Sequence, residues 1–296
     1  MRKFFYTFAI ILTALIFSSN AQALELRVIK FGVLTKLNST EKQFGEVWRK
    51  TFAPNNEALE VEVKFYDSLA TMQLALNAGE INEMVLPEAV AQYFLNRNTD
   101  YEAVLVLKSE GMGLSFGFRN DNEALKNKFN DALKALKKNW RLEAIEGVYV
   151  TSALNKDPEP VDFRKFDNAK KIRVAVTGDL PPIDFTAADG TPAGFNTAVL
   201  AEIGNYLKMN VELLEIDAGA RTAALTSGRA DVVFWYEVDS KSEIQSDVPE
   251  GVTLSESYYE WQKFIHIRKK QNNKSSQSSW SLTDWIFELY DKHDAK

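Results

Sequence analysis

The residue types that perform covalent or metal chemistry are scarce in this chain. It contains no cysteine and only two histidines, His266 in a predicted strand and His293 in the charged C-terminus. A thiol nucleophile and a cysteine-ligated zinc site are therefore excluded, and the two histidines do not have the spacing of a metal site. The glycines of residues 111–113 lack the further glycine and the strand-to-helix context of a phosphate-binding loop. We predict no catalytic residue, no metal site and no cofactor.

Polar side chains at the ends of predicted elements favour ligand binding instead. Asp179 follows a strand predicted at 172–176, and α/β sheets place ligand contacts at the carboxyl ends of their strands. Ser39 and Thr40 precede a predicted helix, whose first backbone N–H groups could receive an anionic group. The alternative for these two residues is an ordinary helix cap, with Asn38 or Ser39 as the capping residue.

A second group of candidates surrounds the strand predicted at 231–236. Three of them stand at its end: Trp235, Tyr236 and Glu237. Aromatic walls and a carboxylate favour a cationic or flat ligand through stacking and cation–π contact, although the two aromatic residues could also pack as core. Arg221, in the helix before this strand, is either a cation of the cleft or a solvated helix charge, and we favour the solvated charge.

One helix–glycine–strand unit occurs twice in the sequence. Residues 75–86 and 224–235 each contain the end of an amphipathic helix, a glycine and an apolar strand. Gly79 and Gly228 would supply the left-handed residue that ends each helix, and the apolar runs suit buried strands of a parallel sheet. Two such units, far apart in the sequence, predict two α/β lobes with a ligand-binding cleft between them.

The other patterns alternate between strands and helices, which indicates mainly parallel sheets. Strands are predicted at 26–34, 61–66, 81–86, 104–107, 113–118, 172–176, 211–216, 231–236 and 264–267. Helices are predicted from the turn at 38–40 to 52, and at 68–79, 88–95, 123–136, 141–145, 196–207 and 220–227. Residues 151–169 are predicted to form a surface linker and residues 179–194 a turn-rich loop.

The N-terminus has the pattern of an export signal. Arg2 and Lys3 form a positive region, residues 4–17 are apolar, and residues 18–23 end in Ala-x-Ala. The apolar stretch is shorter than the roughly 20 residues that a membrane span needs. We predict a signal peptide over residues 1–23, with cleavage after Ala23, and export to a bacterial periplasm, where a chain of this size can be held by its core without disulfides.

Length and composition agree with a globular binding protein. The chain has 296 residues, of which 45% are hydrophobic and 26% charged, enough for one large bilobed domain or two smaller ones. The net charge of −6, without a large basic block, argues against nucleic acid as a partner. At the other end, residues 271–296 are a polar tail with an amphipathic helix at 280–290, which either docks on its own domain or binds a partner.

The segment at 171–195 resembles the opening of a known family. After a strand it contains, in order, Pro181-Pro182, Phe185, Asp189-Gly190 and Gly194-Phe195. This pattern resembles the family 3 solute-binding proteins, the periplasmic receptors of polar amino acid uptake systems. Ala224-Leu225, Gly228, Asp231 and residues 254–259 extend the match. The resemblance implies the type II periplasmic-binding-protein-like fold: α/β, bilobed, with a hinge and a cleft that takes a small-molecule solute.

The first half of the chain resembles the other end of the same family. Residues 31–41 are similar to the start of the family's second lobe, 66–93 to its middle, and 111–146 to the C-terminal strand and helices. The resemblance therefore implies a circular permutation. A lobe 2-like segment (24–150) comes first, and a linker (151–169), a lobe 1-like segment (170–270) and the tail follow. We expect the new termini at a hinge crossing. The alternative is two half-domains that pair between chains.

Some ligand-binding residues of the family have no counterpart here. The arginine that grips an α-carboxylate is expected soon after residues 231–236, but no arginine occurs there before Arg268. Pro87 or Glu88 stands where the family has the aspartate that receives an α-amino group. These departures argue against an α-amino acid as the ligand. The resemblance adds Glu88 and Phe185 to the candidate site.

We therefore predict a periplasmic protein that captures a small polar solute in the interlobe cleft and closes around it. The predicted ligand-binding residues are Ser39, Thr40, Glu88, Asp179, Phe185, Trp235, Tyr236 and Glu237. The resemblance implies a membrane transporter permease of the ABC type, or a sensor, as partner, and we expect a monomer. Two alternatives remain: a dehydratase-like enzyme using Glu88, Glu237 or Asp179 as acid or base, and an interaction protein without a transport role.

Overall fold

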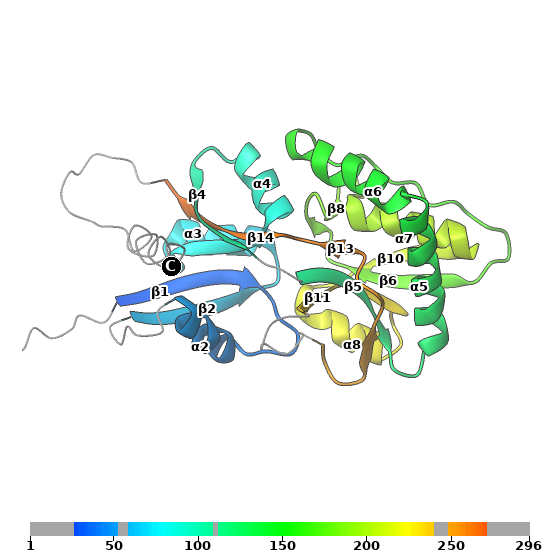
Figure 1. Ribbon diagram of the computed structural model, residues 1–296, viewed down its shortest axis with the longest axis horizontal. Coiled ribbons are helices and arrows are strands. Elements are labelled where there is room, and N and C mark those ends of the chain that lie inside the picture. The colour runs from blue at the N-terminus through cyan, green and yellow to red at the C-terminus, as the bar shows by residue number, and fades with distance from the viewer. Residues whose placement is uncertain (1–26, 53–58, 109–111, 240–247, 271–296) are drawn as a thin grey trace, which may run out of the picture.

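The computed structural model describes residues 27–52, 59–108, 112–239 and 248–270. Its chain forms two α/β lobes that lie side by side (Figure 1). Lobe A is built on a five-stranded sheet, and lobe B on a six-stranded sheet with a small three-stranded sheet beside it. This arrangement confirms the predicted α/β fold with two lobes. The predicted signal peptide and the predicted tail helix lie outside the described residues.

Lobe A takes four of its strands from the N-terminal half of the chain. These strands are β1 (Arg27–Leu34), β2 (Leu59–Tyr66), β3 (Glu83–Pro87) and β4 (Tyr101–Lys108). Its helices are α2 (Glu41–Phe52), α3 (Leu69–Ala78) and α4 (Glu88–Arg97). The fifth strand, β14 (Lys263–Lys269), comes from the end of the described chain and lies antiparallel between β3 and β4.

Lobe B contains the rest of the described chain. Its main strands are β5 (Met112–Arg119), β6 (Lys171–Val176), β10 (Asn210–Glu215), β11 (Val232–Asp239), β12 (Val252–Leu254) and β13 (Tyr259–Glu260). The small sheet consists of β7 (Asp179–Leu180), β8 (Asp184–Thr186) and β9 (Pro192–Ala193). The helices are α5 (Glu123–Lys138), α6 (Arg141–Glu146), α7 (Phe195–Leu207) and α8 (Arg221–Thr226), with short helical turns η1 (Gly147–Thr151), η2 (Ser152–Asn155) and η3 (Ala218–Ala220).

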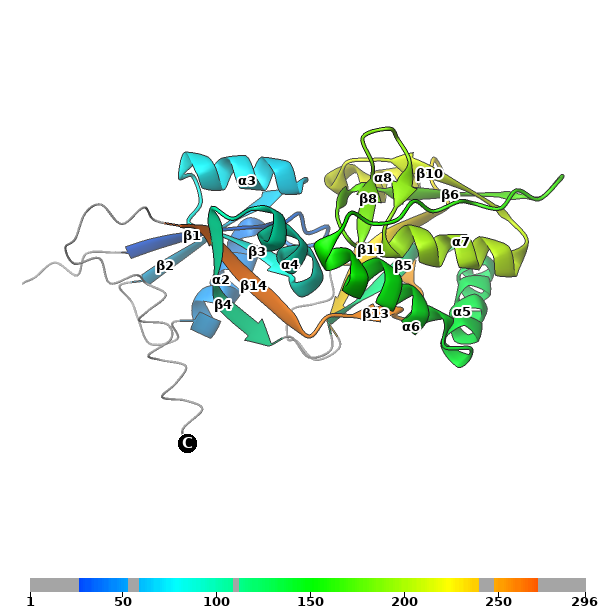
Figure 2. The ribbon, with the colours of Figure 1, turned by 90° about the horizontal axis from the view of Figure 1, so that it is seen from above.

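The two main sheets have the same strand order. Lobe A runs β2-β1-β3-β14-β4, and lobe B runs β10-β6-β11-β5-β12. In each lobe the first three strands are parallel, and the fourth is an antiparallel strand from the other half of the chain. The chain therefore passes between the lobes twice, from β4 to β5 and from β13 to β14; the second passage is visible in Figure 2. Two adjacent crossings of this kind are where a hinge can bend.

The repeated helix–glycine–strand unit occupies equivalent places in the two lobes. Helix α3 begins at Ser68, whose hydroxyl accepts a hydrogen bond from the N–H of Thr71 at 3.1 Å. It ends at Gly79, which has a φ of 74°, and Gly228 after α8 has a φ of 75°. Both glycines thus supply the left-handed conformation that a side chain would make costly, as predicted.

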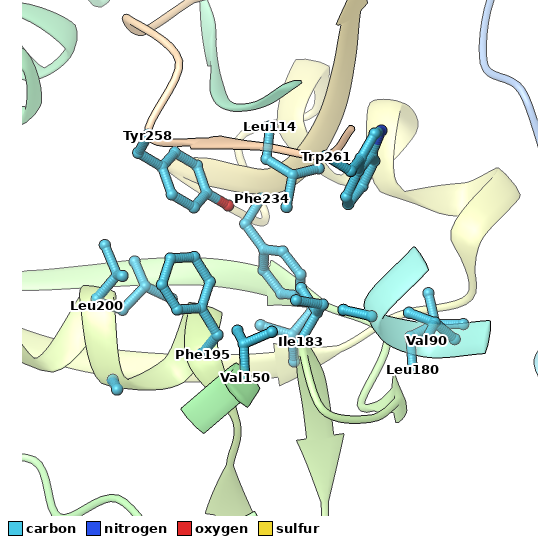
Figure 3. Close-up of a cluster of buried hydrophobic side chains, with 14 of the residues drawn as sticks. Val90, Leu114, Val150, Leu180, Ile183, Phe195, Leu200, Phe234, Tyr258 and Trp261 are labelled. Carbon is cyan, nitrogen blue, oxygen red and sulfur yellow. The ribbon is translucent and has the colours of Figure 1, made fainter. Parts of the chain in front are cut away.

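One hydrophobic core joins the two lobes. A single buried cluster includes Met72 and Val90 from lobe A together with Leu180 and Phe195 from lobe B. Figure 3 shows part of it, with Val90 and Leu180 at one edge. Leu37, in the turn after β1, packs against a separate cluster of lobe B. The lobes are therefore in apolar contact, in addition to being covalently connected.

The structure corrects the predicted cap of the first helix. Thr40, not Asn38 or Ser39, precedes α2, and its hydroxyl accepts a hydrogen bond from the N–H of Gln43 at 3.3 Å. The side chain of Gln43 in turn accepts from the N–H of Thr40 at 3.0 Å. This reciprocal arrangement needs a threonine or serine three residues before a glutamine or glutamate, and only Thr40 satisfies that spacing with Gln43.

Two segments predicted to be irregular contain local structure. Residues 179–194 form the small sheet β7-β8-β9, because the turns at its prolines and glycines bring short strands together. The start of the predicted linker at 151–169 continues the helical turns η1 and η2, and Ala153 and Val161 are buried. Strands β12 and β13 were not predicted, because they are only three and two residues long and have no alternating pattern.

The described ends of the chain lie at the outer edge of lobe A. Because β1 runs parallel to β3 and β14 antiparallel to it, the start of β1 and the end of β14 lie at the same end of the sheet. Figure 1 shows both at the end of lobe A that is far from lobe B. The expected position of the new termini at a hinge crossing stays a prediction, because residues 1–26 and 271–296 lie outside the described part of the chain.

Candidate functional site

The carboxyl ends of parallel strands from both lobes meet at the junction between the lobes. Asp179, after β6, accepts a hydrogen bond from the backbone N–H of Leu69 in lobe A at 3.2 Å. Asp67, after β2, accepts one from the backbone N–H of Gly219 in lobe B at 3.1 Å. Asp67 directly follows β2, and Asp179 follows β6 after Thr177 and Gly178, so the two bonds bring strand ends of the two lobes face to face. Junctions of this kind are the usual ligand sites of α/β proteins.

Asp179 is the predicted site residue that lies most clearly at this junction. One carboxylate oxygen, Oδ2, receives the Leu69 N–H, whereas Oδ1 is buried and has no hydrogen-bond partner among the described residues. Burial raises the pKa of Asp179, while the Leu69 hydrogen bond and the charge of Arg221 oppose this shift. Phe185 lies directly opposite Asp179 in the pairing of β7 with β8 and is half-buried. The structure therefore brings these two candidates together.

Arg221 is buried, so the favoured interpretation of a solvated helix charge is wrong. Its side chain donates to the carbonyl oxygens of Ala218 at 3.2 Å and Phe234 at 3.0 Å. Only 4% of the residue is exposed. A buried guanidinium needs nearby negative charge, and its charge lowers the pKa of Asp179. Arg221 thus supplies a positive charge against Phe234 in the first half of β11, beside the candidate site.

A buried polar group supports the loop that carries Asp179. Asp184 is 2% exposed, and its Oδ2 accepts hydrogen bonds from the backbone N–H groups of Thr177 and Gly178 at 3.0 and 2.7 Å. Nearby, the hydroxyl of Tyr258 donates to Asn196 at 2.8 Å. The amide nitrogen of Asn196 is buried without a partner among the described residues. These groups fix the loop from inside lobe B, and they are not exposed to a ligand.

Glu88 lies at the first residue of α4, near the second crossing. It accepts hydrogen bonds from Gln92 at 3.2 Å and from the ammonium group of Lys263 at 3.3 Å. Burial, together with the charges of Glu146 and Glu88, raises the pKa of Tyr259. Glu88 is therefore part of a charged group beside the crossing and is already paired with a cation.

Ser39 and Thr40 lie in the turn between β1 and α2. Thr40 is exposed and uses its side chain as the cap of α2, so the ordinary-cap alternative describes Thr40. The neighbouring Thr35 donates its hydroxyl to Asp67 at 2.7 Å, which ties this turn to the interlobe contact. The turn borders the junction, but no described contact joins Ser39 or Thr40 to Asp179.

The remaining candidates are Trp235, Tyr236 and Glu237, whose backbone continues β11. Tyr236 pairs with Ser115 and Glu237 with Leu114 of β5, and the register shifts between Val233 and Tyr236. Such an irregularity often re-aims a strand next to a binding site. Their side chains lie outside what the structure describes.

Sequence reasoning missed Asp67 at the junction, and for Arg221 it favoured a solvated charge over a cation of the cleft. Asp67 directly follows a strand and Asp179 lies shortly after one, so the strand-end rule that selected Asp179 also applies to Asp67. Arg221 stands between small and apolar residues, Ala-Gly-Ala before it and Thr-Ala-Ala-Leu after it. That context was the available signal that the start of this helix is packed.

The site suits the binding of a polar solute. It combines a carboxylate with a buried, unpaired oxygen, a buried guanidinium and a half-buried aromatic ring.

Within the described ranges, no group of three or more histidine, cysteine or acidic residues could hold a metal ion. His266 is fully buried in lobe A, where its Nδ1 lies 2.8 Å from Glu83, and it is therefore a core residue of that lobe. No helix in the described part of the chain is long and apolar enough to cross a bilayer.

Several solved structures align with most of the chain at low identity. An ancestral arginine-binding protein bound to arginine aligns over 92% of this chain and 94% of its own, with 12% identity and a TM-score of 0.42. The probable amino-acid ABC transporter extracellular-binding protein ytmK from Bacillus subtilis aligns over 91% and 93%, with 12% identity and a TM-score of 0.42. CbnR in complex with its target DNA aligns over 100% and 81%, with 10% identity and a TM-score of 0.43. These similarities are too remote to assign a ligand or a partner.

A family model gives the more specific result. No curated protein sequence matches the chain. Residues 172–292 match the model of the bacterial extracellular solute-binding proteins, family 3. This match begins at β6 and includes Asp179, Phe185, Arg221 and β11. The resemblance predicted from the motifs at 171–195 is thereby confirmed, and residues 172–292 of this chain are similar to the bacterial extracellular solute-binding proteins, family 3.

Proposed function

We propose that this chain is an exported, periplasmic solute-binding protein that captures a small polar solute between lobe A and lobe B. The observation that carries the proposal is the meeting of strand ends from both lobes at Asp179, within a segment that matches a solute-binding family. The two main sheets have equivalent strand orders, and each takes its fourth strand from the other half of the chain. The two lobes are therefore connected by two chain crossings. Such a molecule can enclose a ligand by hinge bending.

The proposed contacts come from both lobes. Lobe B contributes Asp179, Phe185 and Arg221, together with the predicted residues Trp235, Tyr236 and Glu237. Lobe A contributes Glu88 and the turn with Ser39 and Thr40. The sequence lacks the arginine expected after β11, and Arg221 supplies a buried positive charge against Phe234 within the same strand. A solute with separate cationic and anionic groups would match Asp179 and Arg221.

The mode of action is capture, without chemical change of the solute. A solute-loaded, closed form would then be recognised by an ABC-type permease or by a membrane sensor. We further propose that the chain acts as a monomer, because each lobe receives its fourth strand from the same chain and thus needs no second copy.

We also propose that the chain is circularly permuted relative to its family. The family match begins at residue 172, in lobe B, although lobe A precedes lobe B in the sequence. The start of β1 and the end of β14 lie at the same end of one sheet, so a short connection could join them. Such proximity of chain ends is what makes permutation structurally tolerable.

A ligand screen on the purified exported protein tests the proposed binding function. Amino acids, polyamines, organic acids and short peptides are added singly, and the melting temperature is measured. A specific solute at 100 times its Kd should raise the free energy of unfolding by about 2.7 kcal/mol. Turnover of the hit would show an enzyme, and the absence of stabilisation by any solute would favour an interaction protein; either result contradicts the proposal.

A matched pair of variants tests the proposed site. Asp179→Asn removes the carboxylate at the junction, whereas Asp189→Asn makes the same change at an exposed turn. We expect at least a tenfold weaker affinity for the identified solute with Asp179→Asn and an unchanged affinity with Asp189→Asn, measured by calorimetry on folded protein. Equal affinities of both variants would exclude Asp179 from the site.

A further inference from the structure

Two aspartates bridge the lobes in opposite directions. Asp179 of lobe B accepts from the N–H of Leu69, the first residue of α3 in lobe A. Asp67 of lobe A accepts from the N–H of Gly219, in the turn η3 that precedes α8 in lobe B. Each carboxylate therefore takes a backbone donor at the beginning of a helical segment of the other lobe, where no intrahelical acceptor is available.

The two bonds are electrostatically favourable. A carboxylate accepting a backbone N–H forms a charge-assisted hydrogen bond, and a negative charge is stabilised near the N-terminus of a helix such as α3. In an unbridged molecule, these N–H groups and carboxylates would be hydrated instead. The bonds therefore favour the arrangement in which strand ends of the two lobes face each other.

Asp67 is also held in place within its own lobe, and Asp179 is partly buried beside a cation. Oδ1 of Asp67, which receives the Gly219 N–H, accepts the hydroxyl of Thr35 at 2.7 Å as well. Asp179 is partly buried and lies under the electrostatic influence of Arg221. The carboxylate of Asp67 is thus oriented before it meets lobe B, which lowers the entropy lost when the contact forms.

Contacts elsewhere along the junction act in the same direction. Leu37 of lobe A packs on a cluster of lobe B, and the shared core contains both Val90 and Leu180. On α4, the hydroxyl of Tyr93 donates to Asp157 at 2.8 Å, and Arg97 donates to the carbonyl of Leu154 at 3.0 Å. The aspartates differ from these contacts because each one lies at or near the end of a strand in the junction where the solute is proposed to bind.

We propose that Asp67 and Asp179 form an interlobe latch that holds the protein closed in the absence of solute. The latch uses only groups of this chain, so it does not depend on the identity of any solute or on the proposed transport role. A solute would then enter only when both bonds are broken, and the bonds would form again as the lobes close around it. In this scheme one oxygen of Asp179 serves the latch, and the other remains for a ligand.

The absence of native cysteine allows a direct distance measurement. Leu74 on α3 and Tyr206 on α7 are exposed, and they lie in different lobes. Spin labels are attached to the cysteines introduced by Leu74→Cys and Tyr206→Cys. Pulsed dipolar spectroscopy then gives the distribution of distances between the two labels, and thus between the lobes. Native mass spectrometry first establishes that the full exported protein carries no bound solute.

Without solute, the latch predicts one narrow distance distribution for the labelled parent protein. The Asp67→Ala/Asp179→Ala variant should show a longer and broader distribution. The control variant Asp100→Ala/Asp131→Ala removes two exposed aspartates, one in each lobe, and thus makes the same change in net charge. It should retain the parent distribution.

Two results would overturn the latch. One is a folded Asp67→Ala/Asp179→Ala variant with the parent distribution, where folding is checked by circular dichroism. The other is a broad or bimodal distribution in the solute-free parent protein, a measurement that requires no variant to fold. If the double variant is unfolded, the single exchange Asp67→Ala, at an exposed position, provides the comparison, and it should broaden the distribution on its own.

Discussion

The carboxylate of Asp184 is bound twice by Thr177, once by the backbone N–H at 3.0 Å and once by the hydroxyl at 2.6 Å. This contact closes the loop after β6 and thereby positions Asp179 at the junction. Despite these hydrogen bonds, burial raises the pKa of Asp184 to about 6. The loop that carries the candidate site is therefore held by a carboxylate whose ionisation is costly.

Asp184 makes stability depend on pH near neutrality. Because its folded-state pKa is about 6 and its ordinary value is 3.8, the folded protein binds this proton more tightly than the unfolded chain. The resulting stabilisation is fully present below about pH 4 and is lost as the pH rises through 6. Between pH 7.5 and 5 the free energy of unfolding should rise by about 1 kcal/mol from this group.

Urea unfolding at the two pH values, compared between the parent protein and Asp184→Asn, isolates this contribution. The variant should lose that part of the pH dependence, because an amide does not titrate. Asp189→Asn is the control, since Asp189 is exposed and its pKa is lowered by hydrogen bonds from Thr191. A pH profile of Asp184→Asn parallel to that of the parent would contradict the assignment.

Arg173 should stabilise lobe B through its bidentate pair with Asp231. The guanidinium donates to the carboxylate at 3.0 and 2.7 Å, and this joins β6 to the start of β11. We expect Arg173→Gln to lower the free energy of unfolding by about 1 kcal/mol. A bidentate guanidinium–carboxylate pair stabilises a protein more than an ordinary surface ion pair does. Lys171→Gln is the matched control on the same strand.

Lys171 forms a single, exposed contact with Glu212 at 3.2 Å. Its exchange should cost less than about 0.5 kcal/mol, as is usual for exposed pairs. Both variants are measured by urea unfolding at low and high salt. Equal losses of stability in the two variants would show that the bidentate geometry of the Arg173–Asp231 pair adds no stability.

Gly194, before α7, should not tolerate a side chain. Its φ is 90°, and an added Cβ would lie 2.8 Å from the carbonyl oxygen of Pro182 and 3.0 Å from that of Ile183. Gly194→Ala should therefore lower the free energy of unfolding by roughly 2 kcal/mol or more. Gly147→Ala is the control, because Gly147 has helical angles and nothing within 4 Å of the added Cβ. It should be neutral or stabilising by up to about 1 kcal/mol.

Restoring the proposed ancestral order of the lobes tests the permutation. The rearranged chain starts at Asn168, continues to residue 270, passes through a short flexible linker to residue 27, and ends at Asp167. Its new ends lie in an exposed turn, and the linker joins ends on the same side of the lobe A sheet. We expect a folded monomer with a melting temperature within a few degrees of the parent. A chain that fails to fold, or that folds only as a dimer, would favour half-domains that pair between chains.

The export signal makes a prediction about the mature protein. When the full chain is expressed in a bacterium with its own N-terminus, the periplasmic form should begin at Leu24, because residues 18–23 end in Ala-x-Ala. N-terminal sequencing of the periplasmic fraction checks this. Recovery of the unprocessed chain in the membrane fraction would show an anchor in place of a cleaved signal.

Local patterns in the sequence determined most of the helices and strands. Ser68 and Gly79 delimit α3 because capping depends on neighbouring residues only, and the apolar run at 81–86 is β3 because a buried strand needs apolar residues on both faces. Asp179 could be selected because the end of a strand is visible in the sequence. The cap of α2 was assigned to the wrong residue, because several adjacent polar residues offered similar local chemistry.

The tertiary structure decided which of these pieces meet. The sequence shows β14 and β5 as strands, but not that each completes the sheet of the other half, since pairing over such separations depends on the whole packed core. The sequence favours a surface charge for Arg221, but the packing of α8 against β11 buries its side chain. The contact of Asp67 with Gly219 joins residues separated by 152 positions. The sequence by itself thus determined the two lobes and part of the candidate site. The contacts between the lobes arise only from three-dimensional packing, because they depend on the relative placement of distant segments and not on local propensity.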